Sequence, residues 1–119
     1  MKLKVLRVHN HGDHKKEYVI MEVVENCNIG RYMLADSTYV NPGQASDKLR
    51  HVYWLPNKQV KKGERVTGWT KPGSSTTVIN KADYTIHRLF WGLSAAVWND
   101  EGDCAVLFHL QQWKFFEVE

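Results

Sequence analysis

An apolar run that breaks into an acidic turn and then resumes constrains this chain most. Residues 91–98 are rich in Trp, Leu, Ala and Val, residues 99–103 read Asn-Asp-Glu-Gly-Asp, and residues 104–107 are apolar again. Asn and Asp side chains can hydrogen-bond their own backbone, and Gly102 can take a positive φ, so the middle segment predicts a chain reversal. The pattern indicates β-structure, and it carries no signature of a particular reaction.

The rest of the chain consists of short runs of β-branched and aromatic residues separated by turn residues such as Asn41-Pro42-Gly43. No window of a dozen residues shows clean helical periodicity. We expect strands at residues 3–8, 18–24, 32–35, 49–55, 65–69, 76–79, 85–91, 104–110 and 113–118, with a long loop at 36–47. The predicted fold class is all-β, a sandwich of roughly eight short strands.

Composition predicts one folded domain over residues 1–119. The chain is 43% hydrophobic and contains five Trp, five Tyr and four Phe, which is ample for a core and excludes disorder. The N-terminus alternates charged and apolar residues and no apolar run could span a bilayer, so the chain as it stands is expected to be soluble and cytoplasmic. Cys27 and Cys104 are too few for a disulfide scaffold; we expect two free buried thiols, with one long-range bridge as the alternative.

Three blocks of sequence together resemble the lamin-tail domain. They are Gly12-Asp13 with the two strands after it, Leu55-Pro56-Asn57 with residues 62–66, and residues 97–103 with the apolar run that follows. The resemblance implies an immunoglobulin-like β-sandwich, a fold also found in many bacterial proteins. It implies no shared catalytic residues, because members of the family bind or tether proteins, nucleic acid or cell surfaces. The chain departs from the family pattern at Gln111-Gln112, where a turn with Gly is usual, and at Trp69, where a small or polar residue is usual.

Two polar clusters have the composition of metal sites. One could bind Zn, Ni or Cu through imidazole and carboxylate groups and consists of His9, His11, Asp13 and His14. The other could offer oxygen ligands to Ca²⁺ and consists of Asp100, Glu101 and Asp103. An exposed histidine-rich loop and ordinary turn chemistry explain both clusters more simply. We therefore expect no metal and no cofactor. Ser94 does not lie in a G-x-S-x-G elbow, so we also expect no catalytic activity.

Basic residues are concentrated in residues 47–71, which hold seven basic and two acidic side chains, although the whole chain has a net charge of only +3. Lysine and arginine there could contact phosphates while tryptophan stacks on bases, or they could surround a tryptophan in a protein interface. We expect a non-catalytic binding or scaffolding module for a protein partner, with weak nucleic-acid binding as the alternative. The candidate binding residues are Trp54, Lys58, Lys61, Lys62, Arg65, Trp69 and Lys71.

The placement of these side chains would separate the two alternatives. A continuous stripe of basic side chains would favour nucleic acid, whereas scattered charges would favour a protein. An exposed sheet edge would let a partner strand pair, and any of Trp91, Trp98 and Trp113 that is exposed becomes a candidate anchor residue. We expect no membrane partner, and the sequence leaves the oligomeric state open.

Overall fold

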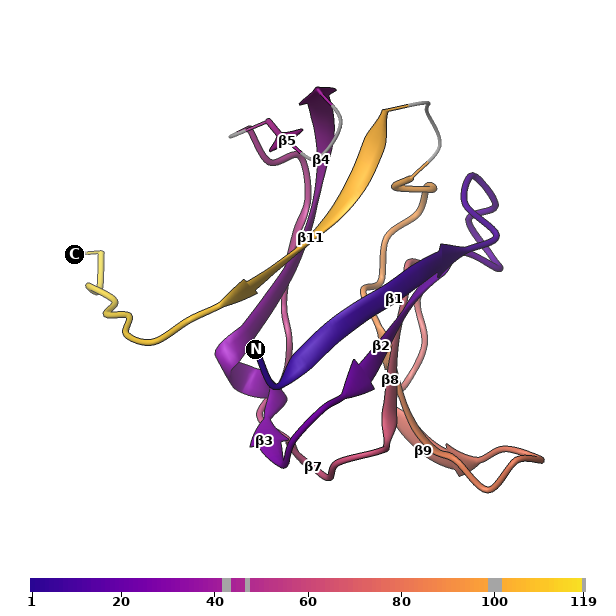
Figure 1. The fold of residues 1–119 in the computed structure, drawn as a ribbon. Coiled ribbons are helices and arrows are strands. Elements are labelled where there is room, and N and C mark those ends of the chain that lie inside the picture. Colours follow the sequence, from indigo (N-terminus) through magenta and orange to yellow (C-terminus); the bar gives the residue numbers. More distant parts are fainter. Residues whose placement is uncertain (42–43, 47, 99–101, 119) are drawn as a thin grey trace.

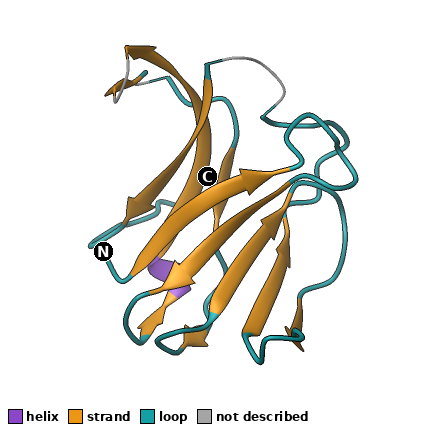
Figure 2. Cartoon of the chain, turned by 45° about the vertical axis from the view of Figure 1, so that its right-hand side comes forward, coloured by secondary structure: helices purple, strands orange, loops and turns teal. Residues whose placement is uncertain are grey.

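The computed structural model describes residues 1–41, 44–46, 48–98 and 102–118. In these residues the chain forms eleven strands and one short 3₁₀ helix, so the prediction of an all-β fold is confirmed (Figures 1 and 2). The number of strands exceeds the roughly eight predicted because three of them, β3, β5 and β7, contain only two residues each.

Two sheets make up most of the domain. The larger has the order β1 (Leu3–His9), β2 (Tyr18–Val23), β8 (Arg65–Trp69), β10 (Thr85–Phe90) and β9 (Thr76–Ile79). Its neighbours are antiparallel except for β8 and β10, which run parallel. The smaller sheet contains β11 (Asp103–His109), β4 (Tyr32–Asn41), β5 (Gln44–Ala45) and β6 (Val52–Trp54). A third pairing joins β3 (Cys27–Asn28) to β7 (Gln59–Val60), and the 3₁₀ helix η1 (Ile29–Arg31) follows β3.

Alternation along the strands explains how the two sheets pack. In β2, Val19, Met21 and Val23 are buried, whereas the residues between them are half-buried on the opposite side of the sheet. The two sheets face each other (Figure 2). The buried side chains of the larger sheet meet those of the smaller sheet in one core, and Tyr32 and Leu34 of β4 belong to it. Burying an apolar side chain of this size contributes roughly 1.5–3 kcal/mol, so the period-2 pattern decides which face of each strand turns inward.

Two predictions of secondary structure were wrong. The predicted loop at 36–47 is strand in its first part, because β4 continues to Asn41. Its polar residues looked like a loop, but Asp36 is buried and accepts a hydrogen bond from the His51 backbone N–H (2.6 Å), while the Ser37 hydroxyl donates to the Ser46 carbonyl oxygen (3.0 Å). Residues 113–118, predicted as a strand, form none, because the chain leaves the sheet after Leu110 and no neighbouring strand pairs with them among the described residues.

A buried carboxylate organises one end of the domain. Glu17, just before β2, is fully buried and accepts four hydrogen bonds. They come from the Thr70 hydroxyl (2.6 Å) and from the backbone N–H groups of Val97 (2.8 Å), Gly12 (2.9 Å) and Trp98 (3.2 Å). One side chain thus joins the β1–β2 hairpin, the end of β8 and the segment before β11. Charge-assisted hydrogen bonds to backbone N–H groups are how such a group is kept in a core.

The reversal predicted at residues 99–103 is described only in part. Gly102 has a positive φ of 87°, as expected, whereas Asn99, Asp100 and Glu101 lie outside the described residues. Residues 42–43 of the other predicted turn also lie outside them. Both cysteines are free thiols, as the first of the two alternatives predicted, but they are half-buried and not buried. In the described part of the chain, no helix has the length and apolar character needed to cross a membrane.

Candidate functional site

The seven candidate binding residues do not form one surface. Trp54 lies on β6 in the smaller sheet, where its indole N–H donates to the Gly30 carbonyl oxygen (2.8 Å). Lys61 and Lys62 lie in the turn between β7 and β8. Lys58 also precedes β8, and its ammonium group donates to the Thr77 hydroxyl on β9 (3.2 Å). The remaining three residues, Arg65, Trp69 and Lys71, belong to β8 or follow it directly.

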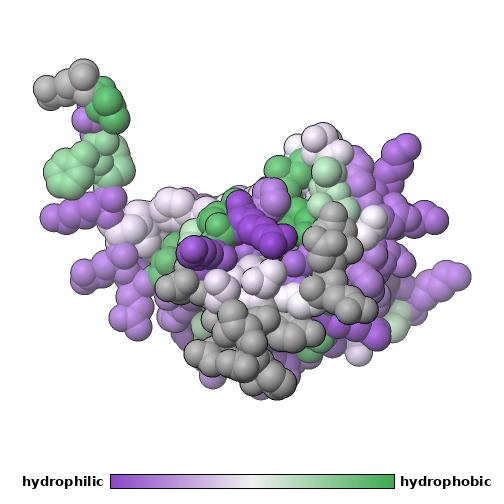
Figure 3. Space-filling model, turned by 90° about the horizontal axis from the view of Figure 1, so that it is seen from above, coloured by the Kyte–Doolittle hydropathy of each residue, from purple (hydrophilic) through white to green (hydrophobic). Residues whose placement is uncertain are grey.

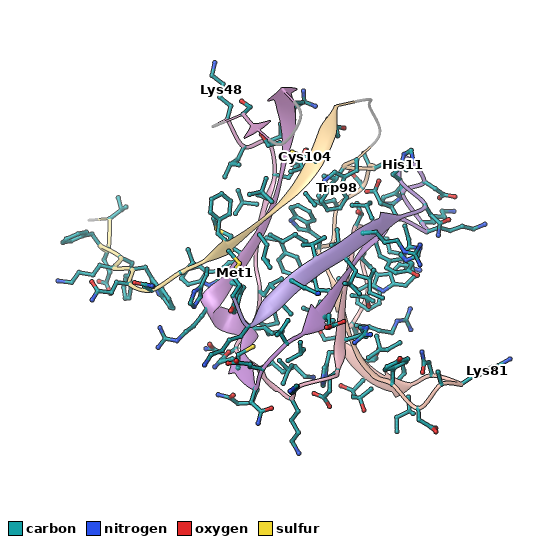
Figure 4. The ribbon with its side chains drawn as sticks, in the orientation of Figure 1. Met1, His11, Lys48, Lys81, Trp98 and Cys104 are labelled. Atoms are coloured by element: carbon teal, nitrogen blue, oxygen red, sulfur yellow. The ribbon has the colours of Figure 1, made fainter. Side chains whose placement is uncertain are left out.

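The basic side chains of residues 47–71 are therefore scattered. Figure 4 shows Lys48 at the top of the smaller sheet, far from the turn that holds Lys61 and Lys62 at the lower ends of β7 and β8 in Figure 1. Arg65 and Lys71 are separated by the whole of β8, which runs from Arg65 to Trp69. No continuous basic stripe, the arrangement expected for nucleic-acid binding, runs along this segment in the described structure.

The register of the larger sheet instead assembles a row of aromatic rings. Tyr18 pairs with His9 on one side and with Trp69 on the other, and Trp69 pairs with Phe90. The rings stack in the same order, with centroids 4.7 Å apart for His9–Tyr18, 4.3 Å for Tyr18–Trp69 and 6.2 Å for Trp69–Phe90. These side chains lie on the side of the sheet opposite the core, because their neighbours along the strands are the buried residues. They cross four adjacent strands.

Trp69 is the centre of this row because two cations approach its ring. The Lys71 ammonium and the Arg88 guanidinium each lie 5.1 Å from the ring centroid, and Arg88 also lies 5.5 Å from that of Phe90. The indole N–H donates to the Thr67 hydroxyl (3.1 Å), which orients the ring on its strand. A cation over an indole face is held by the ring quadrupole. The Trp69 ring is thus held in place by its neighbours.

The same side of the sheet is predominantly basic. The register places Arg7 and Arg88 in the row of residues next to the rings, and Lys4, Glu22 and Arg65 in the row after that. Arg65 pairs with Glu22 (3.5 Å) and lies over the ring of Tyr84 (4.7 Å). We call this surface the outer face; it comprises Lys4, Arg7, His9, Tyr18, Ile20, Glu22, Arg65, Thr67, Trp69, Lys71, Arg88 and Phe90.

His9 adds a ring and no charge to the outer face. The Arg7 guanidinium donates to its Nε2 atom (3.0 Å). Burial and the positive charge of Arg7 both lower the pKa of His9, so the imidazole is neutral at pH 7. The basic character of the face therefore comes from its lysine and arginine side chains.

A chain of polar side chains links β9 to β10 and to the residue before β8. The Thr77 hydroxyl lies 3.2 Å from Nδ1 of His87, and Nε2 of His87 lies 2.9 Å from the Glu64 carboxylate. Burial would raise the pKa of Glu64, but the hydrogen bonds from His87 and from the Lys61 N–H, and the positive charges of these residues, outweigh burial and lower it. A hydroxyl, an imidazole and a carboxylate in series also occur in nucleophilic catalysis. A cavity lies elsewhere, beside Arg31 and residues 111–114. The network joins β9 to His87 of β10 and to Glu64, the residue before β8.

The residues considered as metal ligands have other partners. His9 stacks on Tyr18, Nε2 of His14 lies 2.6 Å from the Leu93 carbonyl oxygen, and the Asp13 carboxylate accepts from the Lys15 N–H. Asp103 lies 3.7 Å from the Arg50 guanidinium. In the part of the chain that the structure describes, no three His, Cys, Asp or Glu side chains form a group able to hold a metal ion.

The three C-terminal tryptophans named above differ in exposure. Trp98 is 3% exposed and packs against Trp91 (5.9 Å between centroids), so both belong to the core or its margin. Trp113 is 47% exposed and meets Trp54 edge-to-face at 5.0 Å. Trp113 is therefore the one of the three that remains a candidate anchor residue.

Sequence reasoning identified Trp69, Lys71 and Arg65 but not the rest of the outer face. His9, Tyr18, Phe90 and Arg88 come from three other strands, and only the sheet register brings them together. The available signal was an aromatic or histidine residue at or beside one end of each of the predicted strands 3–8, 18–24, 65–69 and 85–91. Comparisons with family models, with curated proteins and with solved structures found no match for this chain.

Proposed function

We propose that this domain is a non-catalytic module that binds an acidic segment of a partner protein through its outer face. The observation that carries the proposal is the aromatic row centred on Trp69, with Arg88 and Lys71 against its ring. Tryptophan, tyrosine and arginine are the residues that most often dominate protein interfaces. Cations flanking a fixed aromatic centre match a partner that presents carboxylates together with apolar side chains.

The aromatic rings of the row are already held in place before binding, which favours tight binding. Trp69 is held by Tyr18, Arg88 and the hydroxyl of Thr67, so little side-chain entropy remains to be lost when a partner binds. Lys4, Arg7 and Arg65 lie around the rings, where charges steer an acidic partner and fix its orientation more than they add affinity. Removal of the Trp69 ring should therefore cost about 2 kcal/mol or more of binding free energy.

The packing of the rings favours a protein over nucleic acid. Bases bind to single-strand platforms by stacking on open aromatic faces. Here Tyr18 lies between His9 and Trp69, and Trp69 is contacted by Tyr18, Arg88 and Lys71. Their faces are used within the row, so a strand of nucleic acid would gain phosphate contacts and little stacking. The basic majority on the outer face keeps nucleic acid as the second candidate.

The resemblance to lamin-tail domains points in the same direction, because those domains act by binding and tethering. It supports the class of function without naming a partner, since one fold can carry many functions. A binding role for the smaller sheet rests on less, because Trp54 already donates its N–H to Gly30 and packs against Trp113.

The experiment is a peptide-display selection on the wild-type domain with counter-selection on the Trp69→Ser variant. We expect enrichment of peptides rich in Asp and Glu with an aromatic or aliphatic residue. Fluorescence anisotropy should show that their affinity falls by about tenfold or more in Trp69→Ser and in Arg88→Ser. Trp54→Ser is the matched control, because it removes a half-exposed indole from the other sheet, and it should bind normally.

A salt series with labelled single- and double-stranded DNA separates the two candidates. Tight DNA binding that falls steeply with salt and depends on Arg88 would replace the proposal by its alternative. Selected peptides that bind Trp69→Ser as well as they bind wild type would refute the outer face as the site.

A further inference from the structure

The residues after β11 form an exposed apolar arm. The Leu110 N–H donates to the Arg31 carbonyl oxygen (2.7 Å), and beyond it the chain leaves the body of the domain (Figure 1). Figure 3 shows this arm projecting from the molecule, with hydrophobic atoms near its end. Phe115, Phe116 and Val118 are 83%, 89% and 100% exposed. We call residues 111–118 the tail. A soluble domain rarely displays several large apolar side chains in a row without a partner for them.

The tail is anchored at its base, and its residues 115, 116 and 118 are exposed. The Arg31 guanidinium donates to the Gln111 carbonyl oxygen (3.4 Å) and lies 5.9 Å from the Trp113 ring centroid, and Trp113 packs against Trp54. Residues 113–118 read Trp-Lys-Phe-Phe-Glu-Val, a sequence of high β-propensity without Pro or Gly. This is the composition of a strand that lacks a neighbour.

An exposed sheet edge lies on the other side of the molecule. β9 is the last strand in the order of the larger sheet and pairs only with β10 in the described structure. All four of its residues, Thr76, Thr77, Val78 and Ile79, are exposed, with Ile79 at 71%. Natural edge strands are usually protected by charge, proline or a bulge. β9 contains neither a charged residue nor a proline, so its outer backbone groups can accept another strand.

Charge indicates which strand β9 accepts. The Lys58 ammonium lies on Thr77, Arg88 pairs with Thr76 in the register, and Lys81 follows the strand. Figure 4 places Lys81 at the tip of the turn beyond β9. Two β9 edges paired with each other would bring these cations together. In the tail the charges of Lys114 and Glu117 cancel, so a tail adds no net positive charge to the edge, whereas a second β9 edge would.

From these observations we infer that the tail of one copy adds as a β-strand to the β9 edge of a second copy. Six extended residues span about 20 Å, which exceeds the roughly 13 Å of a four-residue strand. The tail and β9 lie on opposite sides of the domain (Figure 1), so one copy cannot close the contact on itself. The contact is heterologous: each copy donates a tail and accepts another, which produces open chains or a ring.

The test is sedimentation velocity on the full chain, from micromolar to millimolar concentration, with three variants. Wild type should show species that grow with concentration beyond the 13.8 kDa monomer. Phe115→Ser/Phe116→Ser removes the donor, and Ile79→Lys blocks the acceptor; each should weaken association by about tenfold or more. Leu6→Lys is the control, because it places the same charge at an exposed apolar position on β1, the other edge strand of the larger sheet, and it should associate like wild type.

A mixture of the two weakened variants gives the sharpest result. The donor variant keeps its β9 edge and the acceptor variant keeps its tail, so an equimolar mixture should form a 1:1 dimer that does not grow further. Pairing of two β9 edges would instead let the donor variant associate with itself and would give no 1:1 dimer of the two variants. A wild-type monomer at every concentration, unchanged association in the donor variant, or equal loss in Leu6→Lys would overturn the inference. Tail-dependent binding to phosphatidylcholine vesicles without self-association would overturn it in favour of a membrane partner.

Discussion

Replacing Glu17 by Gln should destabilise the domain far more than its single-atom change suggests. Oε1 accepts from the Thr70 hydroxyl and the Val97 N–H, and Oε2 accepts from the N–H groups of Gly12 and Trp98. Either orientation of the glutamine amide turns an NH₂ group toward two donors. The Thr70 hydroxyl can reverse and accept, so the better orientation still sets the NH₂ group against the Val97 N–H.

The magnitude follows from these contacts. One buried N–H loses its acceptor at a cost of about 1–3 kcal/mol, and the remaining bonds lose the strengthening that a charged acceptor provides. We expect Glu17→Gln to lower the free energy of unfolding by about 2–4 kcal/mol. For a domain of this size that corresponds to a fall of roughly 10 °C in Tm.

Urea unfolding followed by tryptophan fluorescence measures the change, and amide hydrogen exchange locates it. The amides of Gly12, Val97 and Trp98 should lose protection before those of β2 and β8. Glu22→Gln is the control, because Glu22 makes a partly exposed ion pair with Arg65 and should cost less than about 1 kcal/mol. A loss under about 1 kcal/mol in Glu17→Gln, or unchanged exchange at Val97 and Trp98, would show that the carboxylate does not hold this end together.

Three further predictions concern the core and the titrating groups. Leu34→Ala, at a fully buried position in β4, should lower the free energy of unfolding in urea by about 2–5 kcal/mol. A loss under about 1 kcal/mol, which is typical of an exposed site, would contradict the place of Leu34 in the core. The pKa of Glu64 is lowered in the folded protein, so the stability that this carboxylate contributes is complete above its ordinary pKa near 4.5 and is lost as pH falls through the lower folded value. Glu64→Gln should therefore flatten the acid side of the stability–pH curve. An unchanged acid side would count against the contact between Glu64 and His87. Burial raises the thiol pKa of Cys27, and burial with the charges of Asp103 and Asp36 raises that of Cys104, so both should react with iodoacetamide at pH 7.5 more slowly than in urea; equal rates would exclude this shielding.

Secondary structure was predictable where the pattern is local. Residues 18–24 are rich in β-branched residues, which predicts a strand, and the structure contains β2 (Tyr18–Val23) there. The prediction failed where a distant partner decided the outcome. Asp36 and Ser37 form strand because the 46–51 segment supplies hydrogen-bond partners for the Asp36 Oδ1 atom and for the Ser37 hydroxyl. Residues 113–118 have strand composition, but strand structure needs a neighbour to pair with.

The candidate binding surface was predictable only in part, for the same reason. Trp69 and Lys71 are close in the chain, so a segment rich in basic and aromatic residues pointed to them. Tyr18, Phe90 and Arg88 reach Trp69 through the pairing of β2, β8 and β10. The parallel pairing of β8 with β10 sets β9 at the edge of the sheet, and no local pattern in the chain predicts that order.

The amino-acid sequence by itself determined that this chain is an all-β domain, because side-chain period and turn residues act between neighbours a few positions apart. It also determined which residues could serve as aromatic and cationic contacts. Tertiary structure alone decided which of these meet. Sheet order and register are set by the simultaneous burial of whole strand faces. The resulting arrangement stacks Tyr18 on Trp69, encloses Glu17 and leaves β9 at an edge of the sheet.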